Sequence, residues 1–281
     1  MKVRILTAAV MLALFVPVLW FSHLPVLYPL SMALLAVIGT LELLRCIGLH
    51  CDLVLSVPAA SAVAAIVFFS RSLGGSSREP LSYLGILAAC FFLLLVYFFL
   101  IAVLREGRLS YGQLMGALGG CFYITLAFSS MVLLRDAEKG VYLFLLPFIG
   151  SWVCDTFAYF VGRLFGRHKL SPVISPKKTV EGSLGGIVFS VGAFALYGAL
   201  LSCRGVSPNY PALLAAGLMV SVVSQIGDLS LSAIKREYGI KDYSRLFPGH
   251  GGVLDRFDSV IATAPLILFF CLLGGSLSLF F

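Results

Sequence analysis

Long apolar runs, separated by short polar segments, make up most of the chain. An α-helix needs about 17–25 apolar residues to cross the ~30 Å hydrocarbon core of a bilayer. Runs of this kind occupy residues 3–22, 24–44, 53–70, 81–104, 112–134, 141–161, 184–203, 210–234 and 257–281. Because they leave no room for a separate soluble domain, the pattern predicts a single integral membrane domain over residues 1–281. Its fold class would be an all-α polytopic membrane protein with about nine transmembrane helices.

Composition agrees with a membrane setting. The chain is 60% hydrophobic and only 12% charged, whereas soluble domains are about 25% charged. The first run follows Lys2 and Arg4 as a secretory signal would, but it is long and no small-residue cleavage site precedes His23. We therefore interpret it as a retained helix. The 7 cysteines show no CxxC spacing, which argues against a zinc site or a redox pair.

Charge asymmetry sets the expected orientation. When alternate loops are assigned to opposite sides of the membrane, one side holds only Arg71, Arg78, Arg135, Lys139 and Arg204 of the 20 basic residues. By the positive-inside rule the richer side is cytoplasmic, which places the amino terminus inside and, with nine spans, the carboxyl terminus outside. The net charge of +7 does not indicate nucleic-acid binding, because no basic face with interleaved aromatic residues occurs on a soluble module.

The two halves of the chain differ in character. In residues 1–135 the charged side chains sit near span ends, where they can snorkel to water, so we interpret this half mainly as scaffold. In residues 141–281 polar side chains fall inside the apolar runs, and the two longest charged loops, 162–183 and 235–256, are predicted to face the cytoplasm. We expect the catalytic half there. Close helix packing is expected at glycines with small-residue spacing, which are Gly116, Gly119, Gly120, Gly182, Gly185 and Gly186.

Asp155 lies well inside the run 141–161, one helical turn from Trp152 and from Tyr159 on a common face. A carboxylate at membrane depth costs about 2.5–3.5 kcal/mol on insertion scales, so it is retained only where it meets a partner, water or a ligand. Two interpretations stay open: Asp155 pairs with a basic residue to fix helix packing, or it lines a functional cavity.

Polar residues in the run 210–234 and just after it recur at helical spacing. Ser221, Gln225, Asp228, Ser232 and Lys235 step by four, three, four and three positions, which gathers them into one stripe on a helix. A polar stripe facing lipid would be very costly, so it must line a cavity or pack on a polar neighbour. A stripe whose hydroxyl groups only formed hydrogen bonds between helices would not require Asp228. We therefore favour the interpretation that the stripe lines a functional cavity.

The loop 235–256 combines positive charge with glycine. Lys235, Arg236, Lys241 and Arg245 supply cationic groups there. Pro248 to Gly252 form a glycine-rich segment whose backbone N–H groups could approach a phosphate, and a helix is predicted to begin near Asp255. Asp255 and Asp258 are three apart and point the same way on a helix, as oxygen ligands of a hard cation do. They could instead be acidic residues favoured at a helix N-terminus.

The loop 162–183 is also basic. It carries Arg163, Arg167, Lys169, Lys177 and Lys178, and the dipeptide at 175–176, Ser-Pro, is suited to opening a helix. This charge could follow simply from the positive-inside rule. Alternatively, it could clamp a polyphosphate or an anionic lipid headgroup.

Two linked motifs resemble a known family. S-x-x-K-R-x-x-x-x-K-D from Ser232 to Asp242 and P-G-H-G-G-x-x-D-R-x-D from Pro248 to Asp258 are similar to the C-terminal motif of the phosphatidate cytidylyltransferases of the integral-membrane type, the CDP-diacylglycerol synthases. The segments W-x-x-D from Trp152, GRLFGRHKL and SPKKTVEG also look like that family's. The resemblance covers roughly residues 150 to 260, and the first half shares only its apolar helices.

The resemblance implies transfer of the cytidylyl group from CTP to phosphatidate, giving CDP-diacylglycerol and pyrophosphate. It implies Mg²⁺ as cofactor, with a monovalent cation such as K⁺ assisting. It implies catalytic roles for Asp228, Ser232, Lys235 and Asp255, and metal binding by Asp228, Asp255 and Asp258. Substrate binding would fall to Asp155, Lys177, Lys178, Arg236, Lys241, Asp242, Gly249, His250, Gly251, Gly252 and Arg256. The size of the chain and the resemblance suggest that the protein lies in the inner (cytoplasmic) membrane of a bacterium. Whether it forms a homodimer stays open.

A mechanism consistent with these residues needs charge neutralisation more than a covalent intermediate, because the phosphate of phosphatidate is already an anionic nucleophile. We expect Mg²⁺ on the acidic residues to bridge the CTP phosphates for in-line attack in a cytoplasm-facing cavity. One rival is a secondary transporter in which Asp155, Asp228 and Lys235 relay protons or ions. Another, a CDP-alcohol phosphotransferase, is disfavoured because its DG-x-x-AR arrangement is absent.

Overall fold

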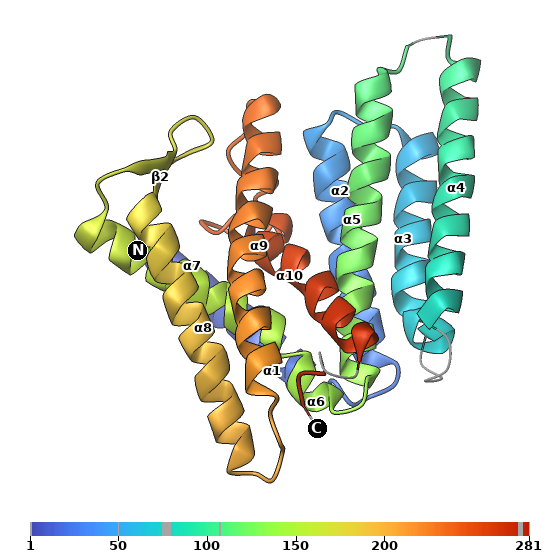
Figure 1. The fold of residues 1–281 in the computed structure, drawn as a ribbon. Helices are drawn as coiled ribbons and strands as arrows, with labels where there is room; N and C mark the ends of the chain where they lie inside the picture. The colour runs from blue at the N-terminus through green and yellow to red at the C-terminus, as the bar shows by residue number, and fades with distance from the viewer. Residues whose placement is uncertain (1, 50, 75–79, 107, 275–277, 281) are drawn as a thin grey trace. The chain divides into compact units, whose positions relative to one another are not determined.

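The computed structural model describes residues 2–49, 51–74, 80–106, 108–274 and 278–280, and the chain there is almost entirely helical (Figure 1). The helices are α1 Lys2–Trp20, α2 Leu27–Cys46, α3 Leu53–Gly74, α4 Pro80–Leu104, α5 Tyr111–Asp136, α6 Gly140–Leu143, α7 Leu146–Phe165, α8 Val180–Ser202, α9 Tyr210–Glu237 and α10 Leu254–Leu273, and the strands are β1 Lys169–Ser171 and β2 Ser175–Thr179. Arg78, counted in the charge asymmetry, lies outside the described residues.

The predicted polytopic all-α class is confirmed. Within the described ranges, eight helices are long and apolar enough to cross a membrane, and α1 adds a shorter apolar stretch, Ala9–Trp20. α4 shows the membrane character most clearly, since Phe92, Leu93 and Val103 expose well over half of their side chains. Apolar faces of this kind are stable against lipid. The chain is therefore a multi-pass membrane protein.

The helices form two compact units, and the first comprises Met1–Asp136 together with Tyr238–Phe257. Its centre is the mutual packing of α2, α3 and α5, with α4 against α3 (Figure 1). Leu44, Leu55 and Leu114 are fully buried there. α2 and α5 approach closely at Gly120, where an added Cβ would overlap the side chain of Leu43.

The second unit comprises Ala137–Glu237 and Asp258–Phe281, so the boundary between the units falls inside α10. Its core is α7 packed on α8, with α9 beside both. Gly182 faces the backbone of α7, where an added Cβ would lie 2.5 Å from the carbonyl oxygen of Ala158. At Gly186 the same test gives 2.8 Å to the carbonyl oxygen of Cys154. These glycines permit the close helix contact.

Close packing at the glycine clusters is thus confirmed in part. Gly120, Gly182, Gly185 and Gly186 all meet neighbouring atoms at short range. The expectation is wrong for Gly116 and Gly119, which have no heavy atom within 4 Å of an added Cβ. Spacing alone identifies small residues that share a helix face, and it does not say whether a partner helix covers that face.

A short antiparallel hairpin, β1 with β2, follows α7. The expectation that Ser175 and Pro176 open a helix is wrong, because these residues lie in β2 and α8 begins only at Val180. The physical reason is a better cap four residues on. The hydroxyl of Thr179 accepts a hydrogen bond from the N–H of Gly182 at 3.2 Å, and threonine is a favoured N-cap residue.

Candidate functional site

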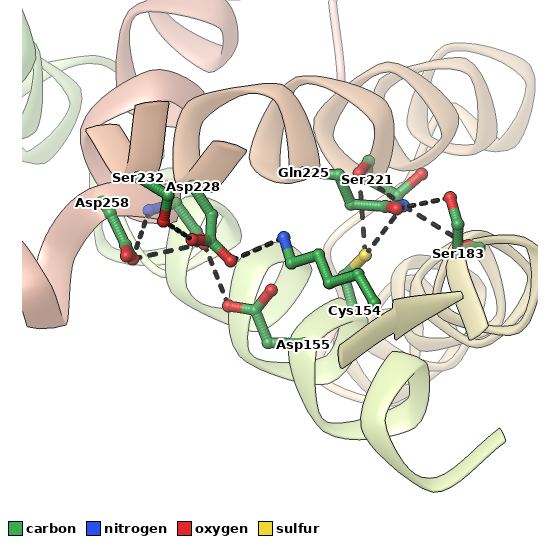
Figure 2. Close-up of polar contacts among 10 residues, drawn as sticks. Cys154, Asp155, Ser183, Ser221, Gln225, Asp228, Ser232 and Asp258 are labelled. Carbon is green, nitrogen blue, oxygen red and sulfur yellow. Dashed lines mark hydrogen bonds and ion pairs between the residues drawn. The ribbon is translucent and has the colours of Figure 1, made fainter. Parts of the chain in front are cut away.

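Three carboxylates from different helices of the second unit point toward one another (Figure 2). They are Asp155 of α7, Asp228 of α9 and Asp258 of α10, and we call them the acidic cluster. The fields of Asp228 and Asp155 both act on Asp258. Residues far apart in sequence therefore meet where the helical stripe of α9 faces α7 and α10. Mutual repulsion among these half-buried carboxylates is a cost that a cation would relieve.

Hydroxyl groups orient the acidic cluster. Ser232 Oγ donates to Asp228 Oδ1 at 3.2 Å, one turn along α9. Ser259 Oγ donates to Asp155 Oδ2 at 3.0 Å and so links α10 to α7. The backbone N–H of Ser259 donates to Asp258 Oδ1 at 2.9 Å. Each carboxylate thus has one oxygen fixed by a neutral donor, which limits its rotation.

Two lysines bring positive charge to the acidic cluster. Lys178 of β2 places its Nζ 2.6 Å from Asp228 Oδ2, so the hairpin reaches the cluster through this side chain. Lys235, at the end of α9, is only 8% exposed and acts electrostatically on Asp258. Lys177, the neighbour of Lys178 along the strand, is exposed. The basic loop 162–183 therefore contributes a specific ion pair as well as general positive charge.

The other end of the α9 stripe packs between helices. Gln225 Nε2 donates to the carbonyl oxygens of Ser183 and Ser221, each at 3.3 Å, and contacts the sulfur of Cys154 at 3.5 Å. Ser183 Oγ donates back to Gln225 Oε1 (Figure 2). The stripe therefore has two parts. Ser221 and Gln225 join α7, α8 and α9, whereas Asp228 is in the acidic cluster, with Ser232 bonded to it and Lys235 acting on Asp258.

Asp255 belongs to the first unit and binds backbone groups there. It is 6% exposed, and its Oδ2 accepts hydrogen bonds from the N–H of Tyr243 at 2.8 Å and of Gly252 at 2.9 Å. These contacts close the segment 240–253 into a compact loop, which we call the motif loop. Metal binding by Asp255 stays a prediction. In the described structure its carboxylate holds the motif loop.

The glycine-rich part of the motif loop turns on itself. The N–H groups of His250 and Gly251 donate to the carbonyl oxygen of Phe247 at 2.8 and 3.1 Å. Gly249 and Gly251 adopt φ of 78° and 85°, a region that suits glycine. Because His250, Gly251 and Gly252 already donate within the protein, phosphate contacts from this loop would come mainly from its side chains. The expectation of substrate binding here stays a prediction.

Basic side chains of the motif loop line an open pocket of about 640 Å³. Lys241, Arg245 and Arg256 are exposed along it, with Asp242 and His250 among the other lining residues. A second pocket of about 510 Å³ adds Arg45 from the end of α2 to the same loop. Arg236 belongs to the second unit, where its Nε donates to the carbonyl oxygen of Ile174 at 3.4 Å. The first unit therefore presents a cationic surface suited to a polyanion.

Sequence reasoning missed Glu42. This residue of α2 was interpreted as able to snorkel to water, and that interpretation is wrong, because Glu42 is 5% exposed. Its carboxylate accepts hydrogen bonds from Ser244 Oγ at 2.6 Å and from the N–H groups of Val253 and Leu254 at 3.0 and 2.9 Å. The available signal is a lone carboxylate inside an apolar run, and local pattern does not identify partners that lie 202 to 212 positions away.

The acidic cluster suits a hard cation chemically. Among the described residues, no group of three or more His, Cys, Asp or Glu side chains is gathered tightly enough to hold a metal ion by itself. Mg²⁺ does not require such a cage, since it commonly binds one or two carboxylates and completes its shell with water and substrate phosphates. Asp228 and Asp258, with Asp155 beside them, supply that kind of open donor set.

Comparison with known proteins gives a consistent result. The model of the cytidylyltransferase family matches residues 2–273. A phosphatidate cytidylyltransferase of Staphylococcus haemolyticus is 37% identical over 268 residues, which cover 95% of this chain and 97% of that protein. A protein of the same name from Staphylococcus saprophyticus is 38% identical over 270 residues, again 95% and 97% of the two chains. The similarity therefore includes the first half, where the motifs gave no guidance.

Proposed function

The chain belongs to the cytidylyltransferase family, and on that premise we propose that it transfers the cytidylyl group of CTP to phosphatidate in a membrane. Relatives that carry the name phosphatidate cytidylyltransferase match nearly its whole length. The acidic cluster is the structural observation that carries the proposal. Three carboxylates inside membrane-spanning helices are costly, and a nucleotidyl transfer that depends on a divalent cation gives them a purpose.

The proposed reaction is an in-line displacement at the α-phosphorus of CTP. A phosphate oxygen of phosphatidate forms the new bond to this phosphorus, and the bond from the α-phosphorus to the bridging oxygen of the β-phosphate breaks. The electron pair leaves with pyrophosphate, and the lipid retains CMP as CDP-diacylglycerol. No covalent enzyme intermediate is needed, because the lipid phosphate is itself a nucleophile. The protein has to bring two anions together and neutralise their charge.

In the proposal, the carboxylates, lysines and serines around the acidic cluster have different roles. Asp228 and Asp258, with Asp155, would hold Mg²⁺, which supplies charge neutralisation on the phosphates when bound. Lys178 and Lys235 place ammonium groups beside these carboxylates, where they can also stabilise phosphate oxygens. Ser232 and Ser259 keep the carboxylates oriented. A carboxylate held in one rotamer needs less reorganisation when substrate binds.

The cationic pockets of the motif loop are assigned to the triphosphate of CTP. Lys241, Arg245 and Arg256 line the larger pocket, and guanidinium groups can bind phosphate oxygens in pairs. The sequence segment from Ser232 to Asp258 contributes residues both to the motif loop and to the acidic cluster. The basic loops favour an active site on the cytoplasmic side of a bacterial inner membrane, where CTP is available.

The proposal is tested with purified protein in detergent, phosphatidate, Mg²⁺ and one nucleotide at a time. We expect pyrophosphate and CDP-lipid to form together with CTP, and neither to form with ATP or GTP. Addition of EDTA should stop both products, and excess Mg²⁺ should restore them. If well-folded protein forms neither product under varied lipid and salt conditions, the proposal fails, and ion-dependent transport by Asp155, Asp228 and Lys235 becomes the hypothesis to test.

A further inference from the structure

Glu42 connects the half of the chain without motifs to the motif loop. It lies near the end of α2, and every partner of its carboxylate lies in or directly after the motif loop. Its Oε1 accepts from Ser244 Oγ and from the N–H of Val253, and its Oε2 accepts from the N–H of Leu254. All of these residues belong to the first unit.

The contact is built around a carboxylate. Leu254 begins α10, and the first N–H groups of a helix have no partner within the helix. Both oxygens of Glu42 are used, so two of these donors and one hydroxyl are satisfied by a single buried side chain. The helix dipole adds to the attraction, because its N-terminal end is positive. A neutral side chain of the same shape could not replace all of these interactions.

The motif loop is shaped to admit the Glu42 side chain. At Gly252 an added Cβ would overlap the Glu42 carboxylate, so only glycine leaves room at this position. On the other side of the loop, Asp255 accepts from the N–H groups of Gly252 and Tyr243. Two carboxylates, one from α2 and one from α10, therefore fix the same short segment. The exposed residues Lys241 and Arg245 lie in this motif loop.

We propose that Glu42 is a positioning residue that holds the motif loop in the shape in which its basic side chains receive the CTP triphosphate. The expected effect on CTP binding rests on the proposed function. The effect of Glu42 on the conformation of the motif loop can be measured without CTP. Glu42 does not contact the reacting atoms in this account. Its effect passes through Ser244, Val253 and Leu254 to the pocket lined by Lys241, Arg245 and Arg256.

The decisive variant is Glu42→Gln. In the wild type both oxygens of Glu42 accept hydrogen bonds, whereas in this variant the amide NH₂ would face one of these donors and could not accept from it. The matched control is Asp52→Asn, which also removes one carboxylate from the first unit. Asp52 pairs with Arg105 and has no bond to the motif loop among the described contacts. Two readouts are needed: the rate of trypsin cleavage after Lys241 and Arg245, followed by mass spectrometry, and the KM for CTP. Cleavage after Arg167, in the second unit, serves as internal reference.

We expect Glu42→Gln to speed cleavage after Lys241 and Arg245 and to raise the KM for CTP, each by about tenfold, the size expected when a charge-assisted hydrogen bond to a buried group is lost. Cleavage after Arg167 and the KM for phosphatidate should stay unchanged, as should every value for Asp52→Asn. Wild-type cleavage rates and KM in Glu42→Gln would overturn the inference. If the wild type transfers nothing from CTP while Glu42→Gln opens the loop, the proposed function fails and the holding role stands.

A general loss of folding would speed cleavage after Arg167 as well. In that case Ser244→Ala decides, because it leaves the Glu42 carboxylate in place and removes one hydroxyl, which donates to Glu42 and accepts from the N–H of Leu246. We expect it to speed cleavage after Lys241 as well as after Arg245, by less than Glu42→Gln does, because loss of the bond to Leu246 alone would affect only the site after Arg245. If Ser244→Ala and the wild type are cleaved at the same rate at every site, the inference that Glu42 holds the motif loop is contradicted.

Discussion

Asp228 is the carboxylate of the acidic cluster to which both Ser232 and Lys178 bond. Asp228→Asn keeps the shape of the side chain and removes its charge. We expect turnover to fall by at least about 10²-fold, as when one transition-state stabiliser is removed, with expression and membrane insertion unchanged. Ser230→Ala, at an exposed position of the same helix, should retain full activity. Near-normal turnover in Asp228→Asn would remove this carboxylate from the mechanism.

Two substitutions of Asp255 separate the effect of its charge from the effect of its hydrogen bonds. The amide oxygen of Asp255→Asn can still accept from Tyr243 and Gly252, whereas Asp255→Ala leaves both buried N–H groups without an acceptor. We expect both variants to lose turnover and only Asp255→Ala to lose protection from trypsin after Arg245. Activity close to wild type in Asp255→Asn would show that the carboxylate acts through the loop alone and would remove it from the predicted metal ligands.

Single residues show how far the sequence could be interpreted. Asp228, Ser232 and Lys235 were placed together correctly, because helical periodicity links positions three and four apart and α9 is one continuous helix. Glu42 was missed because its partners lie 202 to 212 positions away. Local pattern carries no information on contacts of that range. For a lone carboxylate in an apolar run, burial has to be observed before a role can be assigned.

At the scale of secondary-structure elements, the contact between α7 and α8 depends on glycine. Gly182→Ala would place a Cβ against the backbone of Ala158, and overpacking of this kind costs about 1–3 kcal/mol. We expect a lower Tm in detergent. Gly119→Ala, also within a helix but with open space around it, should be neutral or raise stability by up to about 1 kcal/mol. Equal Tm values for the two variants would contradict the described packing.

Helices were predictable where apolar length alone defines them, and all eight long helices overlap predicted runs. The hairpin was not predictable. Its strands are only 3 and 5 residues long, and β2 has no alternating apolar face. The prediction that Ser175 and Pro176 open a helix was wrong because the helix start is set by Thr179, which caps α8. A cap bonded to a backbone N–H identifies a helix start more directly than a proline that can also lie in an edge strand.

At the scale of the whole molecule, the orientation in the membrane can be measured with native cysteines. Cys51 and Cys203 both have exposed side chains, and the charge asymmetry places Cys51 on the cytoplasmic side and Cys203 on the opposite side. In intact cells we expect a membrane-impermeant maleimide to label Cys203, and to label Cys51 only after permeabilisation. Cys51→Ser and Cys203→Ser variants identify each signal. The reverse pattern would invert the orientation.

We expect the cytidylyl group of CTP, and not its terminal phosphate, to move to the lipid. The most direct measurement follows label from CTP that carries ³²P at either the α or the γ position, with phosphatidate and the purified protein. We predict that α-label enters the lipid and that γ-label appears only in pyrophosphate, with Asp228→Asn giving neither. Label from the γ position in the lipid, or no transfer of α-label by folded wild-type protein, would contradict the account.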